Sequence, residues 1–296
     1  MSSLLHYCRR YLLAGEATSS INGRSYIQTA YRASPLGKPM GDALAIKFSS
    51  NIEAMKREYK NYEKVGSQAL PNKRGSFIRR VDFLPVAGNE MPDKSALVME
   101  RGVADVKAFM PKVGGRLEDE LLIDCALTAL RCVEALHSVR LVWNDLKTEN
   151  FVVIEDSRGG VSFKGIDLES CMPVKTAPVD YTPEACPPEF ARSFLDGDAE
   201  SFSLEYSYDV WSYGMFLYEI STGRGFFDGI SAQTITKTLP TFQPNIEKVS
   251  DPLLADLITQ CLSRNPNDRP TVARIFKHPF FADAMSQKNP FDFLFG

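Results

Sequence analysis

The stretch that decides the fold is residues 141–150, which read Leu-Val-Trp-Asn-Asp-Leu-Lys-Thr-Glu-Asn. An Asp stands there two residues before a Lys and five before an Asn, in a loop that leads into a predicted strand. With this spacing Asp145 can accept the proton of a substrate hydroxyl, Lys147 can lie near a transferring phosphate, and Asn150 can hold a metal ion. Each residue alone would indicate only an ordinary polar turn, so the neighbouring sequence has to decide.

Downstream, Asp167 follows Asn150 by seventeen residues. It stands at the end of a predicted hairpin formed by residues 151–154 and 161–166 around Arg158-Gly159-Gly160. At that place a carboxylate can reach a second metal position.

Upstream, Lys47 ends the apolar strand Ala43-Leu44-Ala45-Ile46-Lys47. An unpaired ammonium is costly on a buried strand unless a phosphate or a carboxylate meets it, whereas a surface lysine that extends into solvent is the simpler alternative. A predicted helix over residues 51–65 offers Glu58 as the partner, with Glu53 and Glu63 as competitors.

Together these motifs resemble the eukaryotic protein kinase family over about residues 10–282. Asn144-Asp145 with Asn150 resembles its catalytic loop, Asp167-Leu168-Glu169 its D-F-G motif, and Ala45-Ile46-Lys47 its strand lysine. Three more motifs follow in the family's order: Cys186-Pro187-Pro188-Glu189 resembles A-P-E, Asp209 to Gly214 the buried helix of the larger lobe, and Arg269 the arginine that pairs with Glu189.

The resemblance implies a bilobal α+β fold. Residues 1–101 form a small antiparallel sheet with one helix that binds nucleotide, and residues 102–296 form a mainly helical lobe, with Mg-ATP between the two. The charges fit two lobes: residues 1–103 hold 16 Lys/Arg against 9 Asp/Glu, and residues 104–296 hold 18 against 28. From the residue pattern we expect strands at 10–15, 25–31, 43–48, 77–83 and 96–100, and helices from 117 and over 209–220.

The resemblance also implies the site residues. Catalysis falls to Asp145, Lys147, Lys47 and Glu58, and Asn150 and Asp167 hold Mg²⁺. The expected ATP contacts, besides those two metal-binding residues, are Lys47, Gly15, Ala45, Met99, Glu100 and Gly102, the last three at the hinge.

Three departures from the family pattern stand out. The Gly-rich loop is reduced to Gly15 within residues 13–20, so the glycines that allow close backbone approach to the phosphates are missing there. His-Arg before the catalytic Asp becomes Trp143-Asn144, and the Phe and Gly of D-F-G become Leu168 and Glu169. Glu169 could add a carboxylate to the metal site or point to solvent.

By the resemblance, five residues handle the phosphates, the metal and the proton, and all are present: Lys47, Glu58, Asp145, Asn150 and Asp167. We therefore expect an active enzyme that transfers the γ-phosphoryl group of ATP to protein Ser or Thr. Lys147 and Thr182 resemble the serine/threonine branch. One alternative is a pseudokinase or scaffold that keeps the fold for nucleotide or partner binding. Another is a kinase of small metabolites. Residues 182–189 disfavour it, because they resemble the peptide-docking platform of protein kinases.

Composition limits the setting of the protein. The 296 residues carry a net charge of −3, which gives no indication of nucleic-acid binding, and the longest apolar stretches are interrupted by charges such as Asp124 and Arg131. Six cysteines without a C-x-x-C pair favour free, buried thiols in a reducing intracellular compartment. We expect no membrane span and a monomer.

The catalytic loop also resembles, weakly, plastid kinases of the thylakoid state-transition type. This implies light-harvesting antenna proteins as substrates and the chloroplast as an alternative to the cytoplasm.

Regulation can be predicted from Asn144, which stands where many of these kinases have an Arg that pairs with a phosphate on the activation segment. Because Asn144 carries no charge, we expect activity that does not depend on phosphorylation of Thr176, Tyr181 or Thr182. The alternative is that Lys175 takes over the role of the missing arginine.

Overall fold

The computed structural model describes residues 5–7, 10–19, 25–70, 75–85 and 94–287. The chain divides into two compact units. One comprises Met1–Glu63 and Ile78–Val103, and the other comprises Lys64–Phe77 and Ala104–Gly296. The dipeptide Asn22-Gly23, whose sequence indicates a turn between the first two predicted strands, and the aromatic residues at 291–296 lie outside the described residues.

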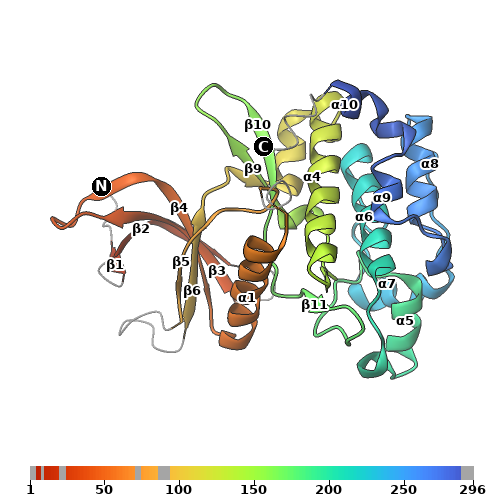
Figure 1. Ribbon diagram of the computed structural model, residues 1–296, viewed down its shortest axis with the longest axis horizontal. Coiled ribbons are helices and arrows are strands. Elements are labelled where there is room, and N and C mark those ends of the chain that lie inside the picture. The colour runs from red at the N-terminus through yellow and green to blue at the C-terminus, as the bar shows by residue number, and fades with distance from the viewer. Residues whose placement is uncertain (1–4, 8–9, 20–24, 71–74, 86–93, 288–296) are drawn as a thin grey trace. The chain divides into compact units, whose positions relative to one another are not determined.

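A six-stranded antiparallel sheet dominates the first unit, with strand order β1-β2-β3-β4-β6-β5 (Figure 1). Its strands are β1 (Leu5–Tyr7), β2 (Tyr11–Ser19), β3 (Ser25–Ala33), β4 (Pro39–Ser49), β5 (Arg80–Leu84) and β6 (Ser95–Glu100). The expected antiparallel sheet is confirmed, and β2, β3 and β4 pair in sequence order as a meander. β6 then inserts between β4 and β5, so that β4 becomes a central strand.

The two faces of β4 have different neighbours. Leu44, Ile46 and Phe48 are buried in an apolar cluster with residues of β2, β3 and β6. The alternation of a strand places Lys47 on the opposite face, where it is also buried, at 6% exposure. Helix α1 (Ile52–Gln68) supplies the partner of Lys47, as described below, and begins in this unit.

One predicted strand is partly wrong. The expected strand over residues 77–83 begins only at Arg80, and Phe77 belongs to the second unit. There Phe77 bridges Gly165, and its ring lies 5.7 Å from that of Trp143. The apolar run therefore serves two packing environments, which an alternation pattern cannot separate.

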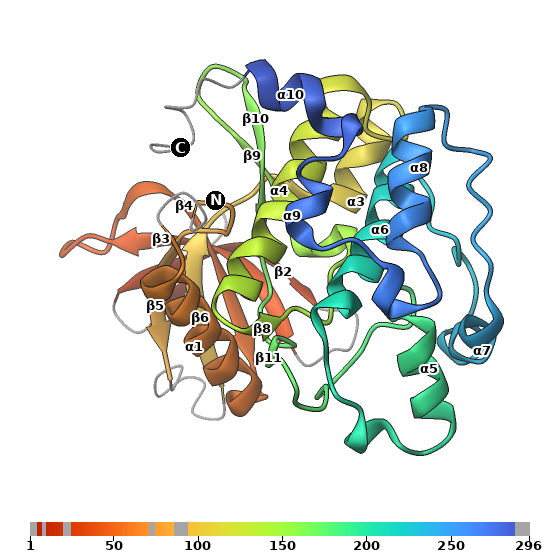
Figure 2. The same cartoon turned by 45° about the vertical axis from the view of Figure 1, so that its right-hand side comes forward.

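The second unit is mainly helical (Figure 2). Its helices of six residues or more are α4 (Asp119–Ser138), α5 (Pro188–Leu195), α6 (Tyr206–Thr222), α7 (Ala232–Thr238), α8 (Pro252–Cys261) and α10 (Ala282–Gln287). Its short helices are α3 (Val106–Phe109) and α9 (Val272–Ile275), with 3-10 turns that include η1 (Met110–Val113), η2 (Thr148–Asn150) and η5 (Pro266–Asp268). Two small antiparallel sheets are formed by β7 (Ala104–Asp105), β9 (Phe151–Glu155) and β10 (Val161–Gly165), and by β8 (Leu141–Val142) and β11 (Met172–Pro173).

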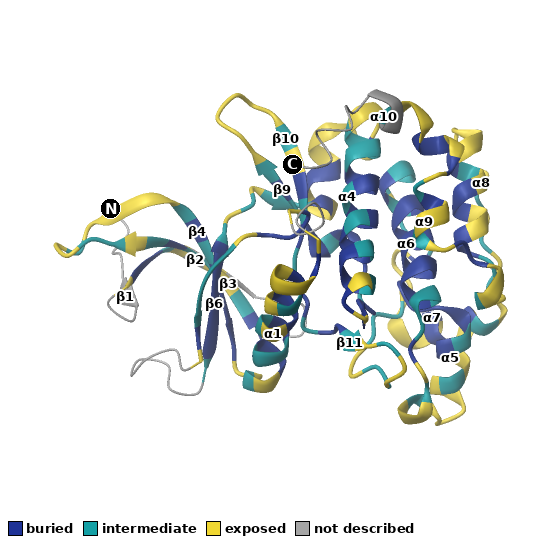
Figure 3. Ribbon diagram, viewed as in Figure 1, coloured by how far each residue is buried: buried dark blue, intermediate teal, exposed yellow. Residues whose placement is uncertain are grey.

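Helix α6 forms the centre of this unit and packs against both α4 and α8. Twelve of its seventeen residues are buried, and Figure 3 shows the buried positions running along its length. A helix buried on most sides belongs in a core, as its composition predicts. It ends at Gly223, which adopts a left-handed φ of 77° and donates its N–H to the Glu219 carbonyl.

The expectation of free, buried thiols is confirmed for the cysteines that the structure describes. Cys125, Cys132, Cys171, Cys186 and Cys261 are all free and buried, whereas Cys8 lies outside the described residues. None of the helices in the described part of the chain has the length and apolarity that a bilayer span requires.

Candidate active site

In the first unit, the central feature is a buried ion pair. Lys47 Nζ donates to Glu58 Oε2 at 3.0 Å, and the two side chains are only 8% and 1% exposed. The competing glutamates have other neighbours: Glu53 is 80% exposed and pairs with Lys56, and Glu63 accepts a hydrogen bond from Tyr59. The helical register therefore selects Glu58 as the partner of this lysine.

The expected nucleotide contacts of this unit lie on neighbouring strands. Ala45 of β4 stands directly opposite Met99 of β6 in the antiparallel register. Met99 is buried, and Glu100 and Gly102, which come shortly after it in the sequence, are half-buried. The amide of Glu100 donates to the Arg79 carbonyl, and its carboxylate accepts from the Arg79 amide. The four expected contact residues, Ala45, Met99, Glu100 and Gly102, thus lie near the end of β6.

Gly15 has a local structural role. It adopts a φ of 74°, and the register between β2 and β3 shifts between Ala14 and Thr18. Its carbonyl accepts a hydrogen bond from Gln28. A bulge of this kind requires a left-handed residue, which explains a glycine at this single position.

In the second unit, Asp209 of α6 anchors the loop of residues 143–150, which resembles a kinase catalytic loop. Its buried carboxylate accepts the amides of Trp143 at 2.8 Å and Asn144 at 2.9 Å. His137 at the end of α4 contacts the same carboxylate at 2.9 Å. Asn144 has a left-handed φ of 67°, so this anchoring holds the loop in a turn that non-glycine residues seldom adopt.

Asp145 is the centre of a hydrogen-bond network. It accepts from Lys147 Nζ at 2.8 and 2.9 Å, from Asn150 Nδ2 at 3.0 Å, and closely from the Thr182 hydroxyl. Lys147 Nζ also donates to Thr182 Oγ1 at 2.9 Å. The side chains of Asp145 and Lys147 remain 13% and 24% exposed, so the network is reachable from solvent.

The electrostatics of Asp145 suit a proton acceptor. Burial raises its pKa above the ordinary value for an aspartate, against the Lys147 charge and the hydrogen bonds from Lys147 and Thr182, and the Asp167 charge adds to the increase. Burial alone lowers the pKa of Lys147, but the Asp145 carboxylate outweighs it and the net direction is upward. A base with a raised pKa retains a proton better after taking it.

Asn150 and Asp167 fit a divalent cation by their chemistry. Both hydrogen bonds from Asn150 Nδ2 go to Asp145, one to its carbonyl and one to its carboxylate, so the amide oxygen of Asn150 is turned to the other side. Asp167 is half-buried, with a left-handed φ of 61°, and its carbonyl accepts the indole N–H of Trp143 at 3.1 Å. Amide and carboxylate oxygens are the donors that Mg²⁺ prefers.

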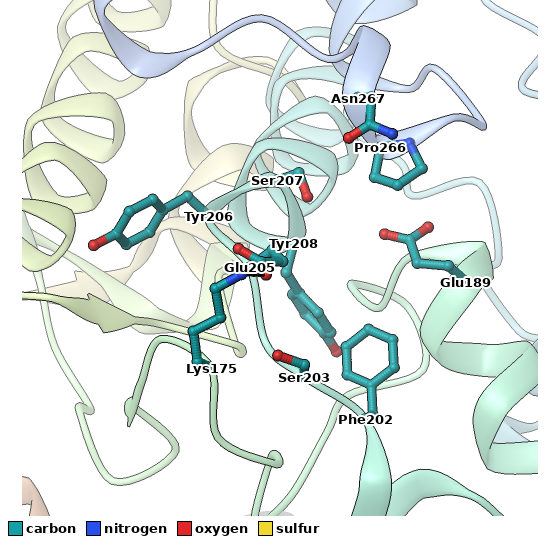
Figure 4. Close-up of a pocket in the computed structure, with 10 residues that line it drawn as sticks. All are labelled: Lys175, Glu189, Phe202, Ser203, Glu205, Tyr206, Ser207, Tyr208, Pro266 and Asn267. Carbon is teal, nitrogen blue, oxygen red and sulfur yellow. Dashed lines mark hydrogen bonds and ion pairs between the residues drawn. The ribbon is translucent and has the colours of Figure 1, made fainter.

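The segment after Asp167 is attached to the rest of the unit at several points. Asn144 Nδ2 donates to the Asp180 carbonyl. The Lys175 amide donates to the Leu204 carbonyl, and the Leu204 amide donates to the Thr176 carbonyl. The Lys175 ammonium pairs with Glu205 at the side of a cavity of about 550 Å³, drawn in Figure 4.

Glu189 lies on the other side of this cavity, as Figure 4 shows. Its carboxylate receives two hydrogen bonds of 2.7 Å from Arg269, whose side chain is fully buried. This is the pairing that the resemblance implied. The bidentate contact fastens α5 to the turn η5.

Sequence reasoning missed two features of the loop. The indole of Trp143, which replaces a histidine of the family pattern, bonds the Asp167 backbone, and His137 supports Asp209. An indole offers one donor and no acceptor, so Trp143 could have been predicted to seek a carbonyl. Nothing in the sequence marks His137.

A family model described as protein kinase domain matches residues 44–281. Serine/threonine-protein kinase pim-2 of Danio rerio is 30% identical over 224 residues, which cover 74% of this chain and 65% of that protein. Mitogen-activated protein kinase kinase kinase 17 of Arabidopsis thaliana is 27% identical over 272 residues, 88% of this chain and 68% of that protein. Tribbles homolog 2 of Mus musculus is 26% identical over 199 residues, 66% of this chain and 56% of that protein. The chain thus spans about two thirds of the length of these relatives, or less.

Proposed function

Because the chain belongs to the protein kinase domain family, which its match over residues 44–281 shows, we propose that it is an active serine/threonine protein kinase that uses Mg-ATP. The observation that carries the proposal is the network around Asp145. One carboxylate with a raised pKa is held by Lys147, Asn150 and Thr182, and it remains partly exposed. Two relatives whose names specify serine/threonine or protein kinase activity support the same class.

In the proposed reaction Asp145 orients the substrate hydroxyl and accepts its proton. Lys147, on the same carboxylate, places a positive charge beside the oxygen that attacks and the phosphoryl group that moves. Bound magnesium ions would neutralise charge on the phosphates, with Asn150 and Asp167 as their protein ligands. Lys47, held by Glu58, would supply the phosphate-binding charge of the first unit.

Thr182 supports the preference for Ser and Thr. Its hydroxyl bonds both Asp145 and Lys147, and so it fixes the segment beside the base. Tyr181 next to it is directed into α5, with its ring 5.1 Å from that of Phe190. We propose that a substrate Ser or Thr hydroxyl bonds Asp145 in the way that the Thr182 hydroxyl does.

The competing function is a pseudokinase or scaffold that keeps the fold without the reaction. The reduced glycine loop and Glu169 are the observations in its favour. A kinase of small metabolites would keep Lys47, Asn150 and Asp167 but would not need the Glu189–Arg269 pairing under the segment.

A phosphate-transfer assay with radiolabelled ATP tests the proposal. Wild type and Asp145→Asn are compared on a mixture of protein and peptide acceptors, followed by phosphoamino-acid analysis. We expect label on Ser and Thr, and a loss of about 10²- to 10⁴-fold in the variant, the range for a positioned acid–base group. Bound ATP without transfer in the wild type would support the scaffold, and label on small molecules alone would support a metabolite kinase.

Substrate and setting extend the proposal. On the resemblance of residues 143–150 to plastid kinases, we include light-harvesting antenna proteins among the acceptors to be assayed, and chloroplast or cytoplasm as the compartment. The enzyme is proposed to act as a monomer. Phosphorylation of isolated antenna proteins, against a control mixture of basic and acidic peptides, tests the substrate directly.

A further inference from the structure

A charged cluster joins three elements of the second unit behind the catalytic loop. Lys107 of α3 places its Nζ 2.7 Å from Glu149 Oε1 in η2 and 3.6 Å from Glu219 Oε1 in α6. Helix α3 is held at its start by Asp105, whose side chain accepts the Ala108 amide at 2.7 Å. The ammonium therefore lies at a fixed place between two carboxylates.

The two carboxylates are partly withdrawn from water. The side chains of Glu149 and Glu219 are 28% and 14% exposed, while that of Lys107 is 50% exposed. Burial raises the pKa of Glu219 to about 6; the Lys107 charge opposes this, and Glu149 and Asp228 add to it. The charges of Lys107 and Lys147 both lower the pKa of Glu149. Without Lys107, Glu149 and Glu219 would repel each other at short range.

Thr148 connects the cluster to the loop. It is fully buried, and its hydroxyl donates to Glu149 Oε2 at 3.2 Å and also bonds Glu219. The next residue of the same turn after Glu149 is Asn150, which donates two hydrogen bonds to Asp145. The position of this turn therefore sets where the Asn150 amide and the Asp145 carboxylate stand.

We propose that Lys107 is a positioning residue for the proposed phosphoryl transfer: by neutralising Glu149 and Glu219 together it holds the turn Thr148–Asn150 in the place that Asp145 and Asn150 require. The ion pairs of Lys107 go to Glu149 and Glu219, which are not among the residues proposed to contact ATP or the acceptor hydroxyl. The inference rests on the proposed function, since it concerns the loop that this function uses.

Removal of the ammonium should act through charge. In Lys107→Met the aliphatic stem is kept, but two neighbouring carboxylates lose their shared counter-ion and the turn shifts to separate them. A misplacement of about 1 Å can reduce a rate by about 10²-fold. We expect kcat to fall about tenfold and the Mg²⁺-dependent affinity for ATP to fall with it, while KM for the peptide stays the same.

The experiment compares Lys107→Met with Lys107→Arg and with Lys112→Met, an exposed lysine on the adjacent turn η1 that serves as the matched control. Lys107→Arg should retain most of the activity because it restores the charge, and Lys112→Met should match the wild type. Adding Glu219→Gln to Lys107→Met should recover part of kcat, because it relieves the repulsion. A merely structural role for Lys107 predicts no such recovery.

Three results would overturn the proposal: wild-type kcat in Lys107→Met, a rise in peptide KM with kcat unchanged, or a double variant worse than the single one. If Lys107→Met fails to fold, Glu219→Gln decides: it lowers the negative charge beside Lys107 and should keep kcat within about twofold, whereas a charged cluster that needs both carboxylates for its shape would lose activity. A wild type without transfer activity would refute the proposed function instead, and magnesium-dependent ATP binding in the same variants would still test whether Lys107 positions the turn.

Discussion

Two lysine–carboxylate pairs lie in the two units and differ in what surrounds them. Lys47 and Glu58 form a pair at 3.0 Å in which both side chains are nearly inaccessible to solvent. Lys147 and Asp145 form a pair at 2.8 Å that is more exposed and shares Thr182 and Asn150 as further partners. The chemistry of the two contacts is the same, and the environment differs.

The difference separates two tasks. A buried pair is strongly destabilised when one partner is removed, because the remaining charge has no water to solvate it. A partly exposed pair with several donors can lose one contact and keep its charge satisfied. We therefore expect the first pair to matter for folding as well as for phosphate binding, and the second mainly for the reaction.

The largest expected effect is that of Glu58→Ala, which leaves the Lys47 ammonium buried without this partner. Its free energy of unfolding should fall by about 3–5 kcal/mol, the range for breaking a buried ion pair. Chemical denaturation of the variant measures the loss. Glu53→Ala on the same helix is the matched control, since Glu53 is 80% exposed and should change stability little. A loss of under about 1 kcal/mol in Glu58→Ala would place this pair in the exposed class.

Lys147→Ala should have the opposite profile. Its stability should change little, but transfer should fall about 10²-fold because a positive charge beside the reacting groups is lost. The pH profile should also move. The Lys147 charge lowers the pKa of Asp145, so its removal raises that pKa, and the base stays protonated to a higher pH. The acid limb of kcat/KM should then shift upward in pH, and an unshifted limb would contradict Asp145 as the base.

Nucleotide binding tests how the first unit substitutes for a glycine loop. Only Gly15 remains there, at a bulge, so few backbone amides are available to wrap the phosphates and metal should carry more of the affinity. Chelation of Mg²⁺ should weaken ATP binding at least about tenfold, or about 1.4 kcal/mol. Calorimetric titration with and without a chelator measures this. Equal affinities would refute the reasoning and favour the scaffold function.

The sequence was sufficient for the elements with a clear period or a dense motif. The helix after residue 117, the hairpin around residues 158–160 and the buried helix that ends at Gly223 were all predicted, because periodicity and turn chemistry act locally. The order of motifs also indicated the family. The strand at residues 77–83 was placed three residues early, because Phe77 pairs with Gly165, which lies far away in the sequence.

For the site, sequence identified the charged residues but not most of what holds them. The choice of Glu58 over Glu53 followed from helical register, which is a local property. The acceptance of two loop amides by Asp209, and the bond from Trp143 to the Asp167 carbonyl, join segments more than twenty residues apart. Such contacts depend on tertiary packing, so no spacing in the sequence marks them.

The smallest expected effect concerns phosphorylation of the segment that follows Asp167. Thr176 is exposed, and its hydroxyl donates to the Pro173 carbonyl at 2.7 Å, while its own carbonyl accepts the Leu204 amide.

Asn144, where a charged residue would await a phosphate, instead donates its amide to the Asp180 carbonyl. The ammonium that could replace it, that of Lys175, pairs with Glu205. The segment is therefore held by contacts already present, among them the Lys175–Glu205 ion pair and the bonds of Thr182 to Asp145 and Lys147, and it needs no added charge to become ordered. Protein dephosphorylated to completion, as verified by mass spectrometry, should have the same kcat/KM as untreated protein. Thr176→Ala should also match the wild type.

Thr182→Ala is the contrasting variant and should lose activity, because the Thr182 hydroxyl bonds Asp145 directly. A large loss on phosphatase treatment that is restored by phosphorylation of the segment, and abolished in Lys175→Met, would instead assign the missing arginine's role to Lys175.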